Sequence, residues 1–164
     1  MQGCWVGDLE SGVPEAVAAR HYDAIIAAHV LEHTRDPSAV LKRLAALLAP
    51  GGSLVVAVPN VLSWRQRWLF LRGRFEYQQS GPLDETHLRF FTYHTAERYL
   101  FAATPELRVV HKSVTGNVPL WGLRRHLLPA GARSAIDAWG CRAHPNLFGD
   151  EILISAIKPP QPSA

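Results

Sequence analysis

The chain has 164 residues, of which 48% are hydrophobic and 19% are charged, a composition typical of one globular domain with a core of its own. Seventeen basic and fourteen acidic residues leave a net charge of +3, an excess too small to indicate a polyanionic partner. The composition excludes a disordered chain, and no apolar run is long enough to cross a bilayer, so we expect a cytoplasmic protein without stable membrane insertion.

Short apolar runs alternate with helical patterns along the chain, which predicts an α/β fold. The first predicted strand covers residues 4–7. The second covers Tyr22–Ala28, where apolar residues are consecutive instead of alternating. This pattern is typical of a central parallel strand that is covered on both faces.

A helix is predicted after this strand. Asp36 can cap its first turn, Pro37 suits the first helical position, and Pro50-Gly51-Gly52 is expected to end it. A buried strand is predicted next, at residues 53–58. A right-handed crossover would place this strand parallel to Tyr22–Ala28.

The second half of the chain continues the alternation of helices and strands. We predict a helix over 61–75, a polar loop to about residue 89, a helix from Thr92 to about residue 103, a strand over 107–114, a connection with one or two short helices over 116–149, and a last strand over 151–157.

Residues 29–33 read HVLEH, the H-x-x-E-H pattern with which some zinc peptidases bind their metal. Such a site needs both histidines on one face of a continuous helix. Here His29 follows a strand directly and Asp36 starts a new helix, so the motif can occupy only a short turn. A zinc hydrolase acting through His29, Glu32 and His33 is therefore a remote alternative, and no metal is predicted. The turn lies at the carboxyl end of a strand, where open parallel sheets bind ligands.

Residues 22–60 resemble the middle of class I S-adenosylmethionine-dependent methyltransferases. The similarity lies in a strand that ends in V-L-E-H, a helix that starts with D-P and ends with P-G-G, and a strand that ends in P-N. Upstream, VGDLES resembles the family's third strand and its adenine-contacting acidic turn. Downstream, GRFEYQQSGPLDETHLRFFT and PNLFGDEILISAIKP are similar to a loop and the final strand of a bacterial subgroup of small-molecule and sugar-linked methyltransferases, near the ubiquinone-biosynthesis and methionine-biosynthesis W types.

The resemblance implies a Rossmann-like sheet whose last strand is antiparallel. It implies one partial methyltransferase domain over residues 1–158, a lid or substrate-loop insertion over 61–92, a second irregular insertion over 116–149, and a disordered tail over 159–164. The implied activity is methyl transfer from S-adenosyl-L-methionine to a small-molecule or sugar-type acceptor.

The resemblance also implies roles for individual residues. Contacts with the cofactor fall on Asp8 and Leu9 at the adenine ring and on His29 and Val30 at the methionine end. The acceptor site would be bordered by Asn60, Asp84, His87 and Arg89. His87 is the candidate base, because an imidazole titrates in the right pH range, and Asp84 or Glu85 could orient it. The alternative left open is that the DETHLRFF segment only holds a loop in place.

A full member of this family begins with a strand, a G-x-G loop, a helix and a second strand, and this sequence contains no G-x-G. In the family's strand order, three-two-one-four-five-seven-six, the loss of strands one and two would turn Tyr22–Ala28 into an exposed edge. We therefore expect a fragment or a wrongly assigned start, and an activity that needs the missing N-terminal half. The alternative is a non-catalytic remnant that binds another chain or self-associates through this edge.

The segment WRQRWLFLRGRF combines basic and aromatic residues, which nucleic-acid and membrane-surface helices also do. The preferred interpretation is a lid over a substrate pocket, with its tryptophans directed inward and its arginines in solvent. No nucleic-acid partner is predicted.

Overall fold

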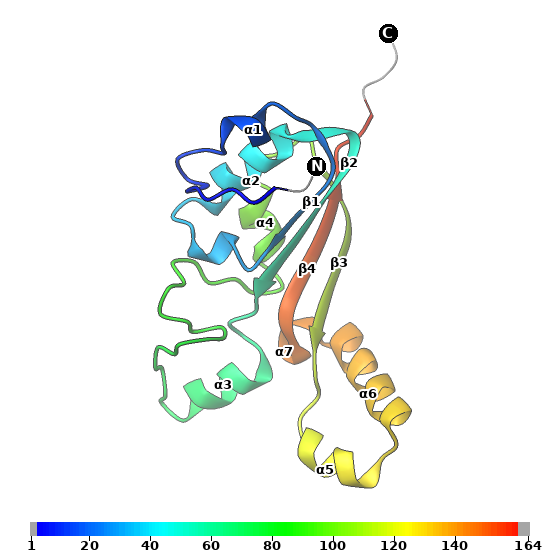
Figure 1. Ribbon diagram of the computed structural model, residues 1–164. Coiled ribbons are helices and arrows are strands. Elements are labelled where there is room, and N and C mark those ends of the chain that lie inside the picture. The colour runs from blue at the N-terminus through cyan, green and yellow to red at the C-terminus, as the bar shows by residue number, and fades with distance from the viewer. Residues whose placement is uncertain (1–2, 161–164) are drawn as a thin grey trace.

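The computed structural model describes residues 3–160, which form a four-stranded sheet with short helices around it (Figure 1). The strands are β1 (Tyr22–Ala28), β2 (Leu48–Pro59), β3 (Arg108–Gly116) and β4 (Gly149–Ile157). The helices are α1 (Glu15–Ala18), α2 (Pro37–Ala46), α3 (Trp64–Leu71), α4 (Ala96–Leu100), α5 (Trp121–Leu127), α6 (Ala130–Ala143) and α7 (Pro145–Phe148), with a 3-10 turn η1 (Leu31–His33). Most of the predicted tail, residues 161–164, lies outside the described residues.

The sheet has the strand order β1-β2-β4-β3. β1 runs parallel to β2, as the strand–helix–strand pattern predicted, and Ile26 is the partner of Val55. β4 runs antiparallel to both β2 and β3. The mixed α/β fold with an antiparallel last strand is therefore confirmed.

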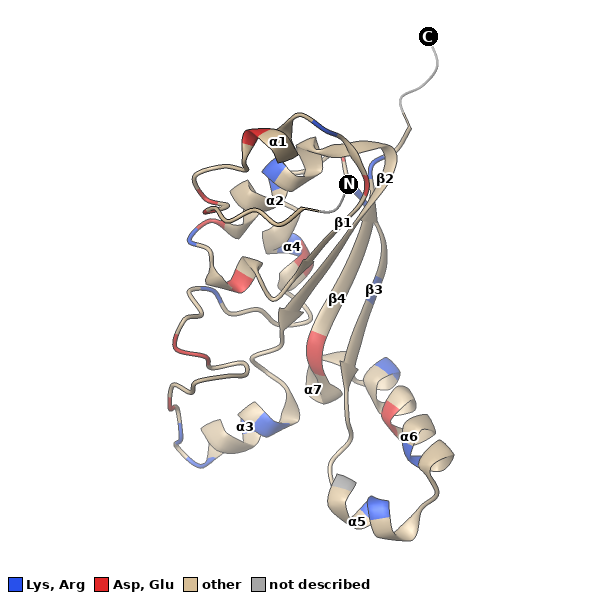
Figure 2. Cartoon of the chain, viewed as in Figure 1, with Lys and Arg blue, Asp and Glu red and all other residues tan. Residues whose placement is uncertain are grey.

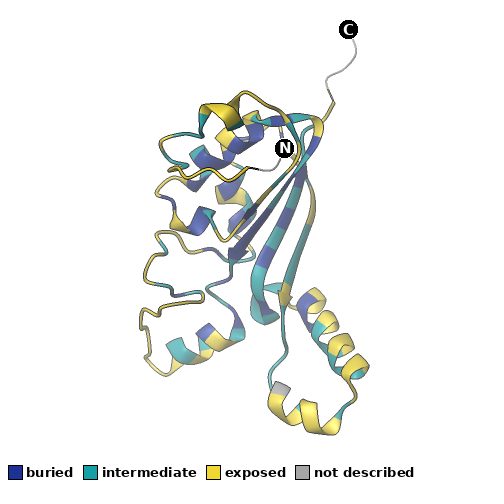
Figure 3. Ribbon diagram, viewed as in Figure 1, coloured by how far each residue is buried: buried dark blue, intermediate teal, exposed yellow. Residues whose placement is uncertain are grey.

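The core lies where β2 and β4 meet the helices. Leu54, Val56, Ile152 and Ile154 are completely buried, and they belong to one cluster with apolar residues of α2 and α4. Figure 1 shows α1, α2 and α4 together on one side of the sheet. Figure 3 shows buried residues concentrated on β2, β4, α2 and α4, whereas α1 has no buried residue. The two inner strands, β2 and β4, are thus well shielded from solvent.

β1 is an edge strand. Its bounds agree with the prediction, but it is not covered on both faces, because Ile26 is 74% exposed and β2 is its only strand partner in the described part of the chain. The expectation of an exposed apolar edge is confirmed. Self-association through this edge stays a prediction.

Two predictions in the first third of the chain were wrong. Residues 4–7 form no strand, and Val6 is 97% exposed, because no described strand offers them a hydrogen-bonding partner. The segment Pro50-Gly51-Gly52 does not end α2, because α2 already ends at Ala46 and β2 begins at Leu48. Gly51 has φ +83° and a Cβ at Gly52 would lie 2.9 Å from the Tyr22 carbonyl oxygen, so these glycines form a bulge inside β2.

In the second half of the chain, the stretch 116–149 is more helical than predicted, whereas the helix predicted from Thr92 to about residue 103 is shorter than predicted. The stretch 116–149 contains three helices, of which α6 has 14 residues and contacts β3. α4 begins after Thr95 because the hydroxyls of Thr92 and Thr95 lie 3.0 Å apart and close a turn before the helix. It ends at Leu100.

Helix α3 carries most of the basic, aromatic segment. Trp64 is directed inward and donates its ring N–H to the Asn117 carbonyl oxygen at 2.9 Å, whereas Trp68 is 57% exposed, so the prediction of inward tryptophans was half right.

Figure 2 shows basic residues on α3, α5 and α6. Between residues 3 and 160 no helix has the length and apolar character that a bilayer crossing requires.

Candidate functional site

A polar cavity of about 420 Å³ lies at the carboxyl ends of β1 and β2. We call it the polar cavity. Its lining comes from the ends of these strands, η1, α3, the loop at residues 80–87 and the start of β4: His29, Glu32, His33, Pro59, Ser63, Arg65, Gln66, Ser80, Gly81, Pro82, Asp84, His87, Asp150 and Glu151. Its volume falls in the range of small-molecule sites.

The HVLEH motif forms the wall nearest to β1. The backbone N–H of His29 donates to the Ala57 carbonyl oxygen at 3.0 Å, which holds the residue against β2. His29 has φ +53°, and this left-handed conformation turns the chain out of β1 and into η1. The motif therefore occupies a short turn, as predicted, and not a continuous helix.

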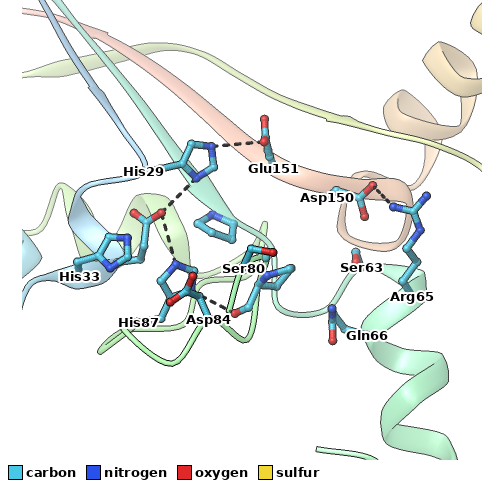
Figure 4. A pocket seen from close by; sticks show the side chains of 14 residues that line it. His29, His33, Ser63, Arg65, Gln66, Ser80, Asp84, His87, Asp150 and Glu151 are labelled. Atoms are coloured by element: carbon cyan, nitrogen blue, oxygen red, sulfur yellow. Dashed lines mark hydrogen bonds and ion pairs between the residues drawn. The ribbon is translucent and has the colours of Figure 1, made fainter. Parts of the chain in front are cut away.

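Glu32 is the buried centre of the cavity wall. Its side chain is 1% exposed, and its Oε1 lies 3.2 Å from His29 Nδ1 and 4.0 Å from His87 Nε2 (Figure 4). Its Oε2 is buried without a hydrogen-bond partner. The Glu32 backbone oxygen accepts from the N–H groups of Leu88 and Arg89, which fastens η1 to the loop that carries His87.

The loop at residues 80–87 presents His87 to this carboxylate. The carboxylate of Asp84 accepts from the Thr86 hydroxyl at 2.6 Å and from the Thr86 N–H at 2.8 Å. These two hydrogen bonds hold the pKa of the Asp84 carboxyl below its usual value. His87 Nδ1 lies 3.3 Å from the Pro82 carbonyl oxygen, so this carbonyl, and not Asp84 or Glu85, orients the ring.

Two of the predicted acceptor residues do not line the polar cavity. Asn60 is completely buried, donates to the Gly149 carbonyl oxygen at 2.8 Å and accepts from the Leu62 N–H. It ties the end of β2 to the start of β4. Arg89 donates to the Arg35 carbonyl oxygen, outside the cavity lining. Both residues therefore support the frame around the cavity.

The predicted cofactor residues are divided between separate places. Leu9 lines a second, mostly apolar cavity of about 350 Å³ together with Trp5, Ala24 and Ile25, whereas His29 lines the polar cavity. Val30 is half-buried and lines neither. The described structure thus does not bring Leu9 and His29 into one cavity.

Asp8 is exposed beside Leu9 and forms a tight turn. Its Oδ2 accepts from the Ser11 hydroxyl at 2.7 Å and its Oδ1 accepts from the Glu10 N–H at 2.9 Å. The hydrogen bond from the Ser11 side chain, with the one from the Glu10 backbone, lowers the pKa of the Asp8 carboxyl. The carboxylate is therefore ionised at neutral pH.

The sequence interpretation missed several polar groups of the cavity. Glu151 Oε1 lies 3.3 Å from His29 Nε2, and the guanidinium of Arg65 pairs with the Asp150 carboxylate at 3.4 Å. Figure 4 shows the three histidines on one side and Ser63, Arg65 and Gln66 on the other. The signal for Glu151 was its place at the start of an antiparallel strand, which brings that end of β4 to the carboxyl end of β2.

The sequence profile of the methyltransferase domain family matches residues 4–104. A search of the curated proteins found no match. Among solved structures, a proposed methyltransferase from Bacillus halodurans is similar to this chain with a TM-score of 0.52 and 13% identity, over 93% of this chain and 70% of that one. At this identity the similarity shows the fold alone.

Two further similar structures are longer than this chain. A SAM-dependent methyltransferase from Archaeoglobus fulgidus has a TM-score of 0.48 and 16% identity, over 88% of this chain and 64% of that one. A chain from the Haloferax volcanii complex of the Trm112 methyltransferase activator with a proposed methyltransferase has a TM-score of 0.49 and 15% identity, over 85% of this chain and 55% of that one. The chain thus spans less than two thirds of either.

Proposed function

This chain belongs to the methyltransferase domain family, and from that premise we propose that it takes part in methyl transfer from S-adenosylmethionine to an acceptor bound in the polar cavity. The observation that carries the proposal is the place of this cavity, at the carboxyl ends of two parallel strands, where open α/β sheets bind their ligands. Methyl transfer from a sulfonium is an in-line displacement. The protein's tasks are to align donor and acceptor and, if the acceptor is a hydroxyl, to remove its proton.

We propose His87 as the group that accepts this proton. The carbonyl oxygen of Pro82 can only accept, so the proton of a neutral His87 ring belongs on Nδ1, and Nε2 keeps its lone pair. The side chain is 7% exposed and lines the polar cavity. Its Nε2 lies 4.0 Å from the Glu32 carboxylate.

The lining of the cavity supports a small, hydroxyl-bearing acceptor such as a sugar derivative. Ser63 and Gln66 both line the cavity, and the Ser63 hydroxyl and the Gln66 side-chain oxygen are buried without a hydrogen-bond partner. Buried polar atoms of this kind need a partner, and a ligand with several hydroxyl groups would supply it. Among the residues predicted to border the acceptor, Asp84 and His87 line the cavity directly, while Asn60 and Arg89 are proposed to act through the surrounding frame.

The proposed cofactor contacts remain those of Asp8, Leu9, His29 and Val30. The chemistry of two of these residues supports the proposal. The ionised carboxylate of Asp8 can accept a hydrogen bond from the adenine amino group, and Leu9 offers an apolar surface beside it. No G-x-G occurs in the sequence to hold the carboxypropyl end. We therefore expect these residues to supply only part of the binding free energy.

Calorimetric titration of the 164-residue chain with S-adenosylmethionine is expected to show weak, saturable binding, with a Kd of about 0.1–1 mM. Asp8→Asn and His29→Ala should each weaken it several-fold, because each removes a proposed polar contact. Asp23→Asn is the matched control, since Asp23 is an exposed carboxylate on β1 that lines neither cavity. Absence of saturable heat well above this Kd, or equal affinity of all variants, would contradict the proposed contacts.

A further inference from the structure

We propose that Glu32, His33 and His87 bind a divalent transition-metal ion, and that Zn²⁺ is the ion that fits them best. One possible ligand atom from each of these residues lies within 4.8 Å of the other two. Within residues 3–160 no other group of three or more His, Cys, Asp or Glu side chains meets this condition. Two neighbouring residues of η1 and one residue of a distant loop therefore converge on one point.

The hydrogen bonds of His33 leave one ring nitrogen free for a metal. The Thr86 hydroxyl donates its single hydrogen to Asp84, so its oxygen can only accept from His33 Nδ1, which lies 3.0 Å away. The Thr86 carbonyl oxygen, 3.3 Å from the same nitrogen, also only accepts. The proton of a neutral His33 ring is thus held on Nδ1, and Nε2 carries a lone pair.

His87 has the same arrangement through a different carbonyl. Its Nδ1 faces the Pro82 carbonyl oxygen, so its Nε2 also carries a lone pair. Histidines that bind metals almost always donate their second ring N–H to a carbonyl, a carboxylate or water in this way. Both imidazoles therefore keep an Nε2 lone pair that an ion could bind.

Glu32 faces these histidines with a carboxylate that is not fully satisfied. His29 Nδ1 lies 3.2 Å from Oε1, but Oε2 is buried with no hydrogen-bond partner, in a side chain that is 1% exposed. Oε1 and His87 Nε2 lie 4.0 Å apart, too far for a hydrogen bond. In a tetrahedral site with Zn–N and Zn–O bonds of about 2.0–2.2 Å, ligand atoms lie roughly 3.3–3.6 Å apart, so this pair must close by about half an ångström when the ion binds.

Two imidazole nitrogens and one carboxylate suit Zn²⁺ better than Mg²⁺ or Ca²⁺, which prefer oxygen ligands. The ligand set differs from the one that the H-x-x-E-H pattern suggests. Both ring nitrogens of His29 are engaged, with Glu32 and Glu151, so His29 is not a ligand. Three protein ligands beside a cavity leave a fourth position for water or an acceptor oxygen.

The use of this ion rests on the proposed methyl transfer, whereas its binding does not. A hydroxyl that binds Zn²⁺ through oxygen has a strongly lowered pKa and gives its proton to water. The oxygen lone pair then forms the bond to the methyl carbon as the carbon–sulfur bond breaks, and the electron pair of that bond stays on sulfur. In the ion-bound form the ion therefore takes over the task proposed for His87.

The test is titration of the metal-free chain with Zn²⁺ by calorimetry, and with Co²⁺ by visible absorption, without S-adenosylmethionine. We expect one ion per chain and a Co²⁺ spectrum of a four-coordinate site. His33→Ala and His87→Ala should each weaken binding by more than about 100-fold, and Thr86→Val should weaken it by about 10–100-fold, as loss of a partner of a ligand does. Mg²⁺ should not compete.

His21→Ala is the control, because His21 is exposed and does not line the polar cavity. His33 is exposed as well, so its replacement should leave the circular dichroism spectrum unchanged even if a change at buried Glu32 prevents folding. The proposal is overturned if no Zn²⁺ binds, if His33→Ala binds as well as the unchanged chain, or if Mg²⁺ competes. None of these results bears on whether S-adenosylmethionine binds, so failure here is distinct from failure of the proposed function.

Discussion

Replacing His87 by alanine is expected to lower the turnover of methyl transfer by about 10²–10⁴-fold, the usual contribution of a positioned acid or base. The ring lies in the cavity wall, its Nδ1 faces a carbonyl oxygen and its Nε2 faces Glu32. Alanine removes the free lone pair, and water cannot readily replace it because the side chain is almost fully buried. The measurement is single-turnover transfer of a labelled methyl group by enzyme that contains this chain.

The matched control is His94→Ala, since His94 is exposed and lies outside the polar cavity. Turnover in this variant should be unchanged. A chelator separates the two roles of His87: a base acts without a metal, whereas an ion-dependent site loses activity and regains it with Zn²⁺. Normal turnover in His87→Ala would contradict both roles.

Ile154→Ala is expected to lower the free energy of unfolding by about 2–5 kcal/mol, the usual cost of truncating a fully buried isoleucine. Ile154 is completely buried in the core cluster and pairs with β2 on one side and β3 on the other. The surrounding strands cannot collapse into the vacated space without breaking these ladders. The cavity should therefore persist and add to the lost transfer free energy.

Ile26→Ala makes the same chemical change on the exposed edge of β1. Because Ile26 is 74% exposed, its loss should cost less than about 1 kcal/mol, mainly through strand propensity. Urea titration of both variants, followed by circular dichroism, measures the difference. An equal loss of unfolding free energy in the two variants would contradict the conclusion that Ile154 on the inner strand β4 is buried while Ile26 on the edge strand β1 is exposed.

The sequence predicted those elements whose signals are local. Tyr22–Ala28 was found with correct bounds because its apolar run is short and continuous. The start of α2 was found because Asp36 accepts a hydrogen bond from the Ala39 N–H and Pro37 needs no partner for its nitrogen. The strand at residues 151–157 was found within two residues.

The sequence could not predict features that depend on which segments meet. Residues 4–7 have the composition of a strand, but a strand also needs a neighbour, and composition does not reveal one. Glu32 appeared in a familiar motif, yet its burial and its approach to His87 depend on a loop more than 50 residues away. Glu151 faces His29 only because β4 runs antiparallel to β2.

The single-sided pairing of β1 has a consequence for amide hydrogen exchange. Along an edge strand, successive N–H groups point alternately toward the neighbouring strand and toward solvent, whereas an inner strand bonds on both sides. Exchange along β1 should therefore alternate between slow and fast from one residue to the next, while β2 and β4 should be slow at consecutive residues. Exchange measured by NMR would show this period of two, and a uniformly slow β1 would show that another polypeptide covers its outer side in solution.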